Sequence, residues 1–338
     1  QVYIAIDAIG GEQSPFKILK GSEIFRKTNP HTKLIFFGNK KIIEDSIIKN
    51  KIKLLNYEIV NSSEDVTDND TPSTILRNRK QSSIYKGLEF VKSNPYSGFV
   101  SAGNTAALMI LSRLLIGMIE GIDRPAICSV IPSRKNFSLM LDLGANVIVN
   151  ASNLLQFALM GYSYFSIIDS KRDPKIGIIN IGTENNKGQE FLQEAADLIS
   201  NSFLKKNFIG FIEPNKITSG YCDIMISDGY TGNIMIKTAE GMSDFITSNL
   251  KNVFVKSFTN KIAYKILEND LKNFRDQINP EKYNGATLIG LNGISVKSHG
   301  NATPYAFSCA LSKCYDFVVN DLNKKIVETS LDRIRQLS

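Results

Sequence analysis

Tryptophan is absent from this 338-residue sequence, and histidine and cysteine are scarce, with two and four residues. No C-x-x-C pair occurs, and no histidine stands at metal-binding spacing from a cysteine. Zinc sites and redox motifs depend on such spacings, so we expect no metal site and four free, buried thiols. The thiols belong to Cys128, Cys222, Cys309 and Cys314. Two histidines are also too few for a polyhistidine metal site.

The sequence also lacks an apolar run long enough to cross a membrane. Its two most apolar stretches, residues 108–119 and 154–168, are interrupted by Arg113 or by other polar residues. Both are shorter than the ~20 apolar residues of a transmembrane helix. The N-terminal apolar run follows no basic segment and therefore does not resemble a signal peptide. We expect a soluble, cytoplasmic protein.

Acidic residues are fewer than basic ones, 33 against 40, which gives a formal charge of +7. Hydrophobic residues make up 43% of the chain and charged residues 22%, the composition of a globular protein. The excess of positive charge is compatible with nucleic acid, a membrane surface or an acidic protein as partner. No recognised nucleic-acid-binding motif is present, so we do not expect a nucleic-acid partner.

Short apolar runs rich in β-branched residues alternate with segments of helical periodicity. This alternation is typical of parallel strands joined by crossover helices. We predict an α/β fold, a three-layer α/β/α sandwich with a mostly parallel sheet. The predicted strands are residues 2–7, 33–38, 98–102, 125–131, 176–179, 207–212, 223–227, 287–291 and 294–297. Because no repeat or low-complexity linker divides the chain, we expect residues 1–338 to form a single domain.

Residues 239–280 depart from this alternation. They contain two series of apolar residues at helical spacing, which lose phase between residues 255 and 260. We predict an antiparallel helical hairpin that projects from the sheet, with Thr259 or Asn260 as the N-cap of its second helix. Between residues 249 and 267 the chain has no acidic residue and four lysines. These are Lys251, Lys256, Lys261 and Lys265.

The predicted tip of the hairpin combines apolar and basic side chains. Val255 and Phe258 lie there with Lys256 and Lys261, a combination that fits the surface of an anionic bilayer. The lysines also fit an acidic protein, because opposite potentials steer association. The apolar helix faces can pair with those of a second subunit to form a homodimer. We favour the dimer for the helix faces and the membrane for the tip.

Loops of small residues follow several predicted strands. In doubly wound sheets, ligands bind at the carboxyl ends of the strands, where backbone N–H groups attract anions. The candidate phosphate- or substrate-binding residues in these loops are Gly10, Gly11, Gly103, Asn104, Thr105, Thr183, Asn185, Lys187, Gly229 and Asn233. A last loop holds Lys297 and His299, and Asp228 follows another predicted strand. Neither G-x-x-x-x-G-K-[ST] nor a strand-linked G-x-G-x-x-G occurs, which argues against nucleotide binding.

Each of these polar residues also has a plainer structural interpretation. Asp228 is suited to cap a helix, and the asparagines and threonines are suited to turns and caps. Lys187 fits a solvated surface lysine, and His299 fits a capping or core histidine. We interpret Asp7, at the end of the first strand, as structural, because its carboxylate can hold neighbouring loop amides.

Eight collinear runs of sequence resemble the phosphate acyltransferases of bacterial phospholipid synthesis, the PlsX family. They are residues 4–11 (IAIDAIGG), 101–109 (SAGNTAALM), 120–125 (EGIDRP), 141–146 (LDLGAN), 180–188 (NIGTENNKG), 228–233 (DGYTGN), 237–241 (KTAEG) and 288–300 (LIGLNGISVKSHG). The runs follow the family's order and span nearly the whole chain. Ile9, Glu12, Ala106 and the pair Asn301 and Ala302 depart from the family's usual residues, which affects local geometry more than activity.

The resemblance implies an enzyme that transfers a long-chain acyl group from acyl carrier protein to inorganic phosphate. The acyl phosphate would then serve a membrane acyltransferase that loads glycerol-3-phosphate in phospholipid synthesis. Phosphate is itself the nucleophile, so the resemblance implies no nucleotide, metal or other cofactor. It also implies a cytoplasmic homodimer that associates peripherally with the membrane.

Such a reaction needs groups that hold a dianion near a carbonyl, stabilise an oxyanion and protonate a leaving thiolate. Within the resemblance we assign Lys297 and His299 to phosphate binding or to protonation of the sulfur. Asp228 is assigned to proton acceptance or to orienting a cation. Two alternatives stay open: a short-chain phosphotransacylase that uses acyl-coenzyme A, and a non-catalytic membrane-associated scaffold. An oxidoreductase is disfavoured because the nicotinamide-binding motif is missing.

Overall fold

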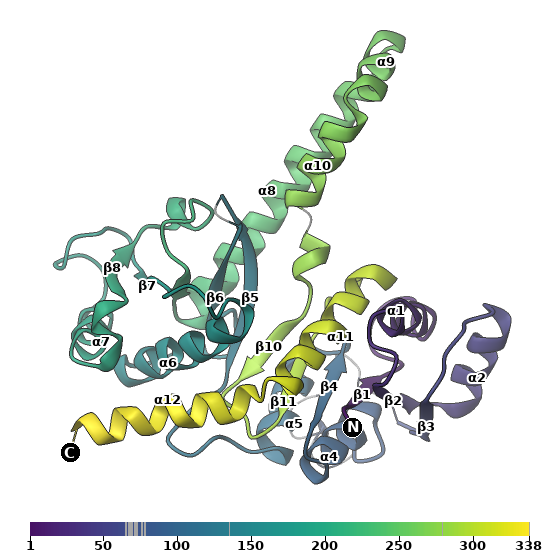
Figure 1. Cartoon of the computed structure of the whole chain (residues 1–338), viewed down its shortest axis with the longest axis horizontal. Coiled ribbons are helices and arrows are strands. Elements are labelled where there is room, and N and C mark those ends of the chain that lie inside the picture. The colour runs from purple at the N-terminus through teal and green to yellow at the C-terminus, as the bar shows by residue number, and fades with distance from the viewer. Residues whose placement is uncertain are drawn as a thin grey trace.

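The computed structural model describes residues 1–64, 66, 70, 74–75, 77, 79–134, 136–278 and 280–337. Within these residues, eleven strands share one sheet in the order β3-β2-β1-β4-β11-β10-β5-β6-β9-β7-β8. Seven of the neighbouring pairs are parallel. The antiparallel pairs are β10–β11, β10–β5 and β5–β6. Helices cover both faces, so the predicted α/β/α sandwich with a mostly parallel sheet is confirmed (Figure 1).

The strands fall into three groups along the sheet. The first group consists of β1 (Tyr3–Asp7), β2 (Lys33–Gly38), β3 (Tyr57–Asn61) and β4 (Ser97–Ser101). The central group consists of β11 (Ile294–Lys297), β10 (Ala286–Ile289), β5 (Ala126–Ser133) and β6 (Asn136–Leu141). The last group consists of β9 (Ile224–Ile226), β7 (Ile176–Ile179) and β8 (Phe208–Ile212).

The sequence pattern predicts neither β3 nor β6. β3 lies at the edge of the sheet and is only partly buried, so its sequence, YEIVN, carries a weak apolar signal. β5 continues to Ser133, two residues beyond the predicted end, and forms a tight antiparallel hairpin with β6 in which Pro132 pairs with Phe137. Residues 136–141 form a strand by pairing with β5 on one side and with β9 on the other.

Two hydrophobic cores lie between the sheet and its helices, and alternate strand residues enter them. Ile4 and Ile6 belong to one core, and Ala5 between them belongs to the other. The first core is closed by α1 (Phe16–Arg26), α2 (Lys40–Lys49), α6 (Ala151–Ile168), α7 (Glu190–Ser200), α11 (Pro304–Val319) and α12 (Leu322–Leu337). The second is closed by α4 (Ser83–Ser93) and α5 (Thr105–Leu115). No helix among the described residues is both long and apolar enough to span a bilayer.

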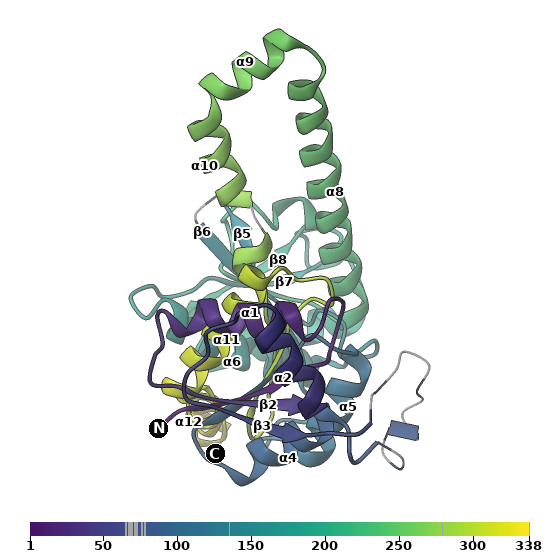
Figure 2. The same ribbon diagram turned by 90° about the vertical axis from the view of Figure 1, so that its right-hand side faces the viewer.

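Three helices leave the body of the protein and form an arch (Figures 1 and 2). They are α8 (Gly229–Val255), α9 (Phe258–Ile266) and α10 (Glu268–Ile278). The predicted cap, Thr259 or Asn260, is wrong: the hydroxyl of Ser257 accepts the N–H of Asn260 at 3.1 Å and caps α9. Because Ser257 supplies the capping oxygen, α9 begins at Phe258, earlier than the predicted caps would place its start.

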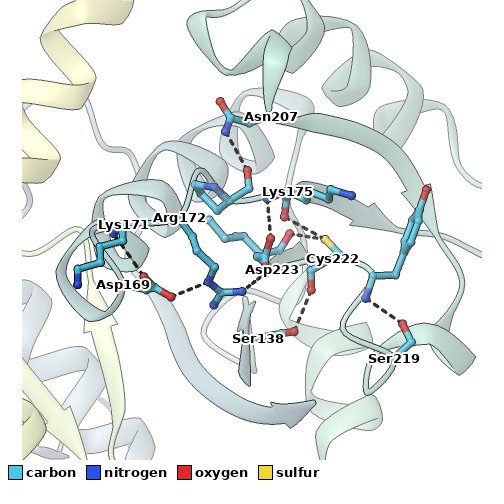
Figure 3. A network of polar contacts seen from close by, with 12 residues as sticks. Ser138, Asp169, Lys171, Arg172, Lys175, Asn207, Ser219, Cys222 and Asp223 are labelled. Carbon is cyan, nitrogen blue, oxygen red and sulfur yellow. Dashed lines mark hydrogen bonds and ion pairs between the residues drawn. The ribbon is translucent and has the colours of Figure 1, made fainter. Parts of the chain in front are cut away.

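An ion-pair network around Arg172 connects the amino-terminal ends of β7 and β9 (Figure 3). Its guanidinium binds Asp169 at 2.5 Å and Asp223 at 3.0 Å, and Asp223 also accepts the backbone N–H of Lys175 at 2.9 Å. The rings of Phe137 and Phe165 lie 5.3 and 5.1 Å from the guanidinium carbon. This network joins the loop before β7 to the start of β9, and it has a structural role.

Candidate active site

The carboxylate of Asp7, at the carboxyl end of β1, organises the loop that follows it. It accepts the backbone N–H groups of Ile9 at 3.3 Å and Gly10 at 3.1 Å. The hydroxyls of Ser83 and Ser101 each donate to it at 2.6 Å. Burial raises the pKa of Asp7, whereas these four hydrogen bonds act to lower it. The contacts agree with the structural interpretation of Asp7.

Glycines bring three loops together at this end of the sheet. A Cβ atom added at Gly10 would lie 2.6 Å from the backbone nitrogen of Gly103, and one added at Gly11 would lie 2.7 Å from the carbonyl oxygen of Gly300. Gly11 also has a φ of 80°, which L side chains rarely adopt. The N–H of Glu12 donates to the carbonyl of Gly300 at 2.8 Å. The loops after β1, β4 and β11 therefore meet, and side chains larger than hydrogen would separate them.

Lys297 is the last residue of β11 and is mostly buried at this meeting point. Its ammonium donates to the carbonyl of Ser298. Burial lowers the pKa of Lys297 to about 8; the charges of Lys17 and Lys237 add to this shift, and Asp7 opposes it. Lys297 therefore shares this part of the protein with two other cations, Lys17 and Lys237.

His299 lies two residues beyond Lys297, and its side chain is half-exposed. Its Nε2 atom is 3.7 Å from Oε1 of Glu240, whose other oxygen binds Lys237 at 2.7 Å. Burial lowers the pKa of His299, Glu240 raises it, and Lys237 and Lys297 lower it further. A neutral imidazole can accept a proton, and a neighbouring carboxylate then stabilises the imidazolium that forms.

The N-terminus of α5 begins directly after Gly103. The side chain of Asn104 accepts the N–H of Ala107 at 2.8 Å and caps the helix, and Thr105 is exposed in the first turn. Backbone N–H groups at such a terminus are donors for an anion. The structure therefore brings Gly10, Gly11, Gly103, Asn104, Thr105, Lys297 and His299 together at one end of the sheet.

Asp228 belongs to a second group of residues, at the start of α8. Its carboxylate accepts the N–H of Thr231 at 2.8 Å and the hydroxyl of Thr231 at 2.7 Å, so it caps the helix. The N–H of Gly229 donates to Asn146 at 2.7 Å. Asn233 lies on the next turn, 3.6 Å from a Cβ built at Gly144.

A cavity of about 480 Å³ opens beside this cap. Val147, Ile148, Phe191 and Tyr230 supply most of its apolar lining, and Asp228 lies at its wall. Within the part of the chain that the structure describes, the hydrogen bonds of Asp228 reach neither Lys297 nor His299. A rise of about 1.5 Å per residue puts Asp228 roughly 18 Å along the α8 axis from Glu240, which neighbours His299. The cap and the lysine–histidine group thus lie at two points of one helix.

The loop between β7 and α7 forms a third group. Asn180 closes this loop by donating to the carbonyl of Lys187 at 2.9 Å. Thr183, Asn185 and Lys187 are exposed, and Lys187 pairs with Glu184 at 3.0 Å. Gln189, which follows this loop, lines the cavity.

Three charged residues of the site are missed by motif reasoning: Lys17, Lys237 and Glu240. Lys237 and Glu240 lie three residues apart in the KTAEG run, on α8. The run does not indicate that they lie near His299, because this depends on how α8 packs against the sheet. Lys17 is on the buried face of α1, four residues before the buried Gly21, and this helical spacing is the available sequence signal. Among the described residues, no group of three or more His, Cys, Asp or Glu side chains is arranged to hold a metal ion.

The sequence is similar to those of known proteins over nearly its whole length. A model of the family described as fatty acid synthesis protein matches residues 2–325. A phosphate acyltransferase of Anaplasma phagocytophilum (strain HZ) is 38% identical over 314 residues, which are 92% of this chain and 91% of the relative. A phosphate acyltransferase of Clostridium tetani (strain Massachusetts / E88) is 37% identical over 328 residues, 96% of this chain and 98% of the relative.

Solved structures share the fold at low sequence identity. A phosphotransacetylase from Streptococcus pyogenes superposes with a TM-score of 0.63 at 15% identity and covers 94% of both chains. A branched-chain phosphotransacylase from Enterococcus faecalis V583 superposes with a TM-score of 0.58 at 11% identity, over 94% of this chain and 99% of the other.

Proposed function

The chain belongs to the phosphate acyltransferase family, and from this premise we propose that it transfers a long-chain acyl group from acyl carrier protein to inorganic phosphate. Membership of the family makes it an acyltransferase that uses phosphate. The observation that carries the finer proposal is the meeting of three glycine-rich loops around Lys297 and His299. The product is acyl phosphate for phospholipid synthesis.

Phosphate attacks the thioester carbonyl in this reaction. A phosphate oxygen forms a bond to the carbonyl carbon, the carbon–sulfur bond breaks, and the sulfur leaves with a proton. The ammonium of Lys297 offsets the charge of the phosphate. Gly11 and Gly103 lie in the loops that meet beside it, and we assign them to close approach of the backbone to the phosphate. Asn104 and Thr105, at the start of α5, are in position to serve the oxyanion that forms on the carbonyl.

His299 is the group that moves the proton. Because its pKa is lowered, the imidazole is neutral near pH 7 and accepts the proton of the attacking phosphate. Glu240, at 3.7 Å, stabilises the imidazolium, which then protonates the leaving sulfur. Asp228 has a positional part in this proposal: it caps α8, the helix that carries Glu240.

The second and third groups of residues are suited to the acyl donor. The apolar cavity beside Asp228 offers a surface for the non-reacting part of the thioester. Gly229 and Asn233 lie in the first turns of α8, which lines the cavity through Tyr230 and Thr231, and Thr183, Asn185 and Lys187 are exposed on the loop before α7. An acidic carrier protein would meet positive charge from the lysines of the arch.

The arch supports proposals about partners and location. Its tip exposes Val255 and Phe258 beside Lys256 and Lys261, and we propose that this tip contacts an anionic membrane from the cytoplasmic side. Phe245, Ile246 and other apolar residues of α8 are exposed at helical spacing, which supports pairing with a second copy in a homodimer. A protein so placed would release acyl phosphate next to a membrane glycerol-3-phosphate acyltransferase.

One assay tests the proposed function. The purified protein is incubated with inorganic phosphate and, separately, palmitoyl carrier protein, palmitoyl-coenzyme A or acetyl-coenzyme A, and acyl phosphate is trapped with hydroxylamine. We expect turnover with palmitoyl carrier protein to exceed that with acetyl-coenzyme A by at least about 100-fold. Turnover with acetyl-coenzyme A alone would contradict the proposal.

That last outcome would favour the second candidate, a short-chain phosphotransacylase that uses acyl-coenzyme A. The observation behind it is the fold shared with proteins named phosphotransacetylase and phosphotransacylase, at TM-scores of 0.63 and 0.58. The non-catalytic scaffold is not proposed further, because the family to which the chain belongs consists of enzymes.

A further inference from the structure

Lys17 lies inside the protein although it is a charged residue near the start of α1. It is 1% exposed, and its ammonium donates to the carbonyl of Gly300, 283 positions later in the chain. A Cβ atom added at Gly11 would lie 2.9 Å from Nζ of Lys17. The lysine therefore lies directly behind the glycine loop, on the side opposite the surface. α1 reaches this place because it packs against α11 (Figure 1).

Among the described residues, no acid forms a salt bridge with the ammonium of Lys17 or of Lys297, although Glu12 acts on the first and Asp7 on the second. Asp7 already accepts four hydrogen bonds. Glu12, the acid that acts on Lys17, is exposed to solvent, and Glu240 is engaged by Lys237. The first turn of α1 has no acidic residue to offset its own positive end.

The charge of Lys17 disfavours the charged form of Lys297. Burial lowers the pKa of Lys17, and burial together with the charge of Lys17 lowers the pKa of Lys297 to about 8. Two cations in a water-poor site are costly unless an anion lies between them.

A partly buried lysine, Lys313, offers a comparison. Lys313 donates to the carbonyls of Tyr283 at 3.1 Å and Gly285 at 2.8 Å, and these acceptors satisfy most of its ammonium. Among the described residues, Lys17 donates only to the carbonyl of Gly300 and Lys297 only to that of Ser298. Each of these two therefore keeps N–H donors for a further acceptor.

We propose that Lys17 and Lys297 together form the floor of an anion subsite in which Lys17 binds the phosphate substrate from behind the Gly11 loop. This inference rests on the proposed function for the identity of the anion. Two cations favour a dianion over a singly charged ion. Lys17 is a binding residue and takes no part in proton transfer, so its contribution falls on the affinity for phosphate.

The test compares Lys17→Met with Lys20→Met, a matched variant on the same helix whose lysine is partly exposed and pairs with Glu23. Initial rates are measured with palmitoyl carrier protein while phosphate is varied, and the reverse. For Lys17→Met we expect the KM for phosphate to rise at least tenfold and the KM for the acyl donor to change less than about twofold. Lys17→Arg should recover part of the loss, and Lys20→Met should match the unaltered protein. An unchanged KM for phosphate in folded Lys17→Met would overturn the proposal.

A measurement of phosphate binding tests the anion subsite independently of the proposed function. The melting temperature of each protein is measured in inorganic phosphate and in sodium chloride of equal ionic strength. Ligand that binds only the folded state raises stability with its concentration, so we expect phosphate to protect the unaltered protein and Lys20→Met but not Lys17→Met. This pattern supports the subsite even if no donor yields acyl phosphate, the result that would defeat the proposed function. Equal protection of all three proteins would overturn the subsite. Near-ultraviolet circular dichroism in phosphate-free buffer verifies that Lys17→Met is folded.

Discussion

His299 illustrates how a residue's neighbours set its chemistry. An isolated histidine has a pKa near the middle of the physiological range, at about 6.5. Here burial and two lysines lower the pKa, and Glu240 provides the opposing charge. The result is a neutral imidazole with a carboxylate ready to stabilise its protonated form, which is the arrangement that a proton carrier needs.

We expect His299→Ala to lower kcat for acyl-phosphate formation by about 100-fold, because a positioned acid–base group contributes roughly that factor or more. The KM for phosphate should change little, since the lysines remain. Initial rates with saturating phosphate measure the effect, and His31→Ala, which alters the other histidine, is the control. Near-normal kcat in a folded His299→Ala protein would remove the residue from the mechanism.

The pKa of Lys297 predicts a pH dependence. Its charged form predominates below about pH 8 and is lost above it. We therefore expect the KM for phosphate to rise as the pH passes about 8, approaching tenfold per pH unit. Steady-state assays between about pH 7.5 and 9.5 measure this, with Lys297→Met as the variant that should lack the dependence. A KM that stays constant across this range would contradict the assignment.

The lowered pKa of Lys297 also affects stability: raising the pH weakens phosphate binding but stabilises the fold. A lysine whose pKa is lower in the folded state than in the unfolded one costs folding free energy below pH 8, and the cost disappears toward pH 10.5. Lys297→Met should therefore melt at a higher temperature than the unaltered protein at pH 7. A higher melting temperature would indicate that Lys297 is kept for function at the expense of stability, and an unchanged or lower one would contradict this.

At the scale of elements, the arch shows what periodicity can and cannot predict. Apolar residues at helical spacing indicate helices in residues 239–280, and helices are there. The helix α8 begins at Gly229, ten residues before the predicted hairpin, and its return arm consists of α9 and α10. The break between these two at Leu267 has no signal in the apolar pattern, which runs on through it.

The tip of the arch makes a testable surface. Phe258 is 78% exposed and Val255 54%, with lysines on both sides. We expect Val255→Ser with Phe258→Ser to lower binding to anionic liposomes at least about tenfold, because burying either side chain in lipid is worth roughly 1.5–3 kcal/mol. Flotation measures the binding, and turnover with soluble donor should stay within about twofold.

The matched control for the tip is Ile48→Ser with Leu55→Ser, since these side chains are 75% and 79% exposed on the body of the protein. Their replacement should leave flotation unchanged. Flotation of the tip variant equal to that of this control would refute membrane contact by the tip.

At the scale of the whole molecule, the central strands unite two halves that each hold part of the site. β10 pairs with both β11 and β5, and β5 pairs with β6, so the central strands connect the loops around Lys297 to the loop of Asn146, which accepts the N–H of Gly229 at the start of α8. One hydrophobic core includes Ile6 from the first half and Ile178 from the second. This continuity supports our proposal that residues 1–338 are one domain.

A single domain predicts one cooperative unfolding transition. Differential scanning calorimetry should show one peak whose calorimetric and van't Hoff enthalpies agree, because the shared core and sheet couple the halves. Intrinsic tyrosine fluorescence should report the same midpoint. Two resolved transitions would show that the halves unfold independently and would contradict the proposal.

The sequence by itself determined the alternation of strands and helices, the small residues at the carboxyl ends of the strands and the basic, acid-free segment of the arch. These follow from local chemistry: side-chain periodicity, glycine's tolerance of close approach, and charge. Only the tertiary structure decided which loops meet. It joins Gly10 to Gly103 and Gly11 to Gly300, draws Lys17 into the site, and places Asp228 farther along α8. Contacts such as that between Lys17 and Gly300, 283 positions apart, depend on how whole elements pack, and no local pattern contains that information.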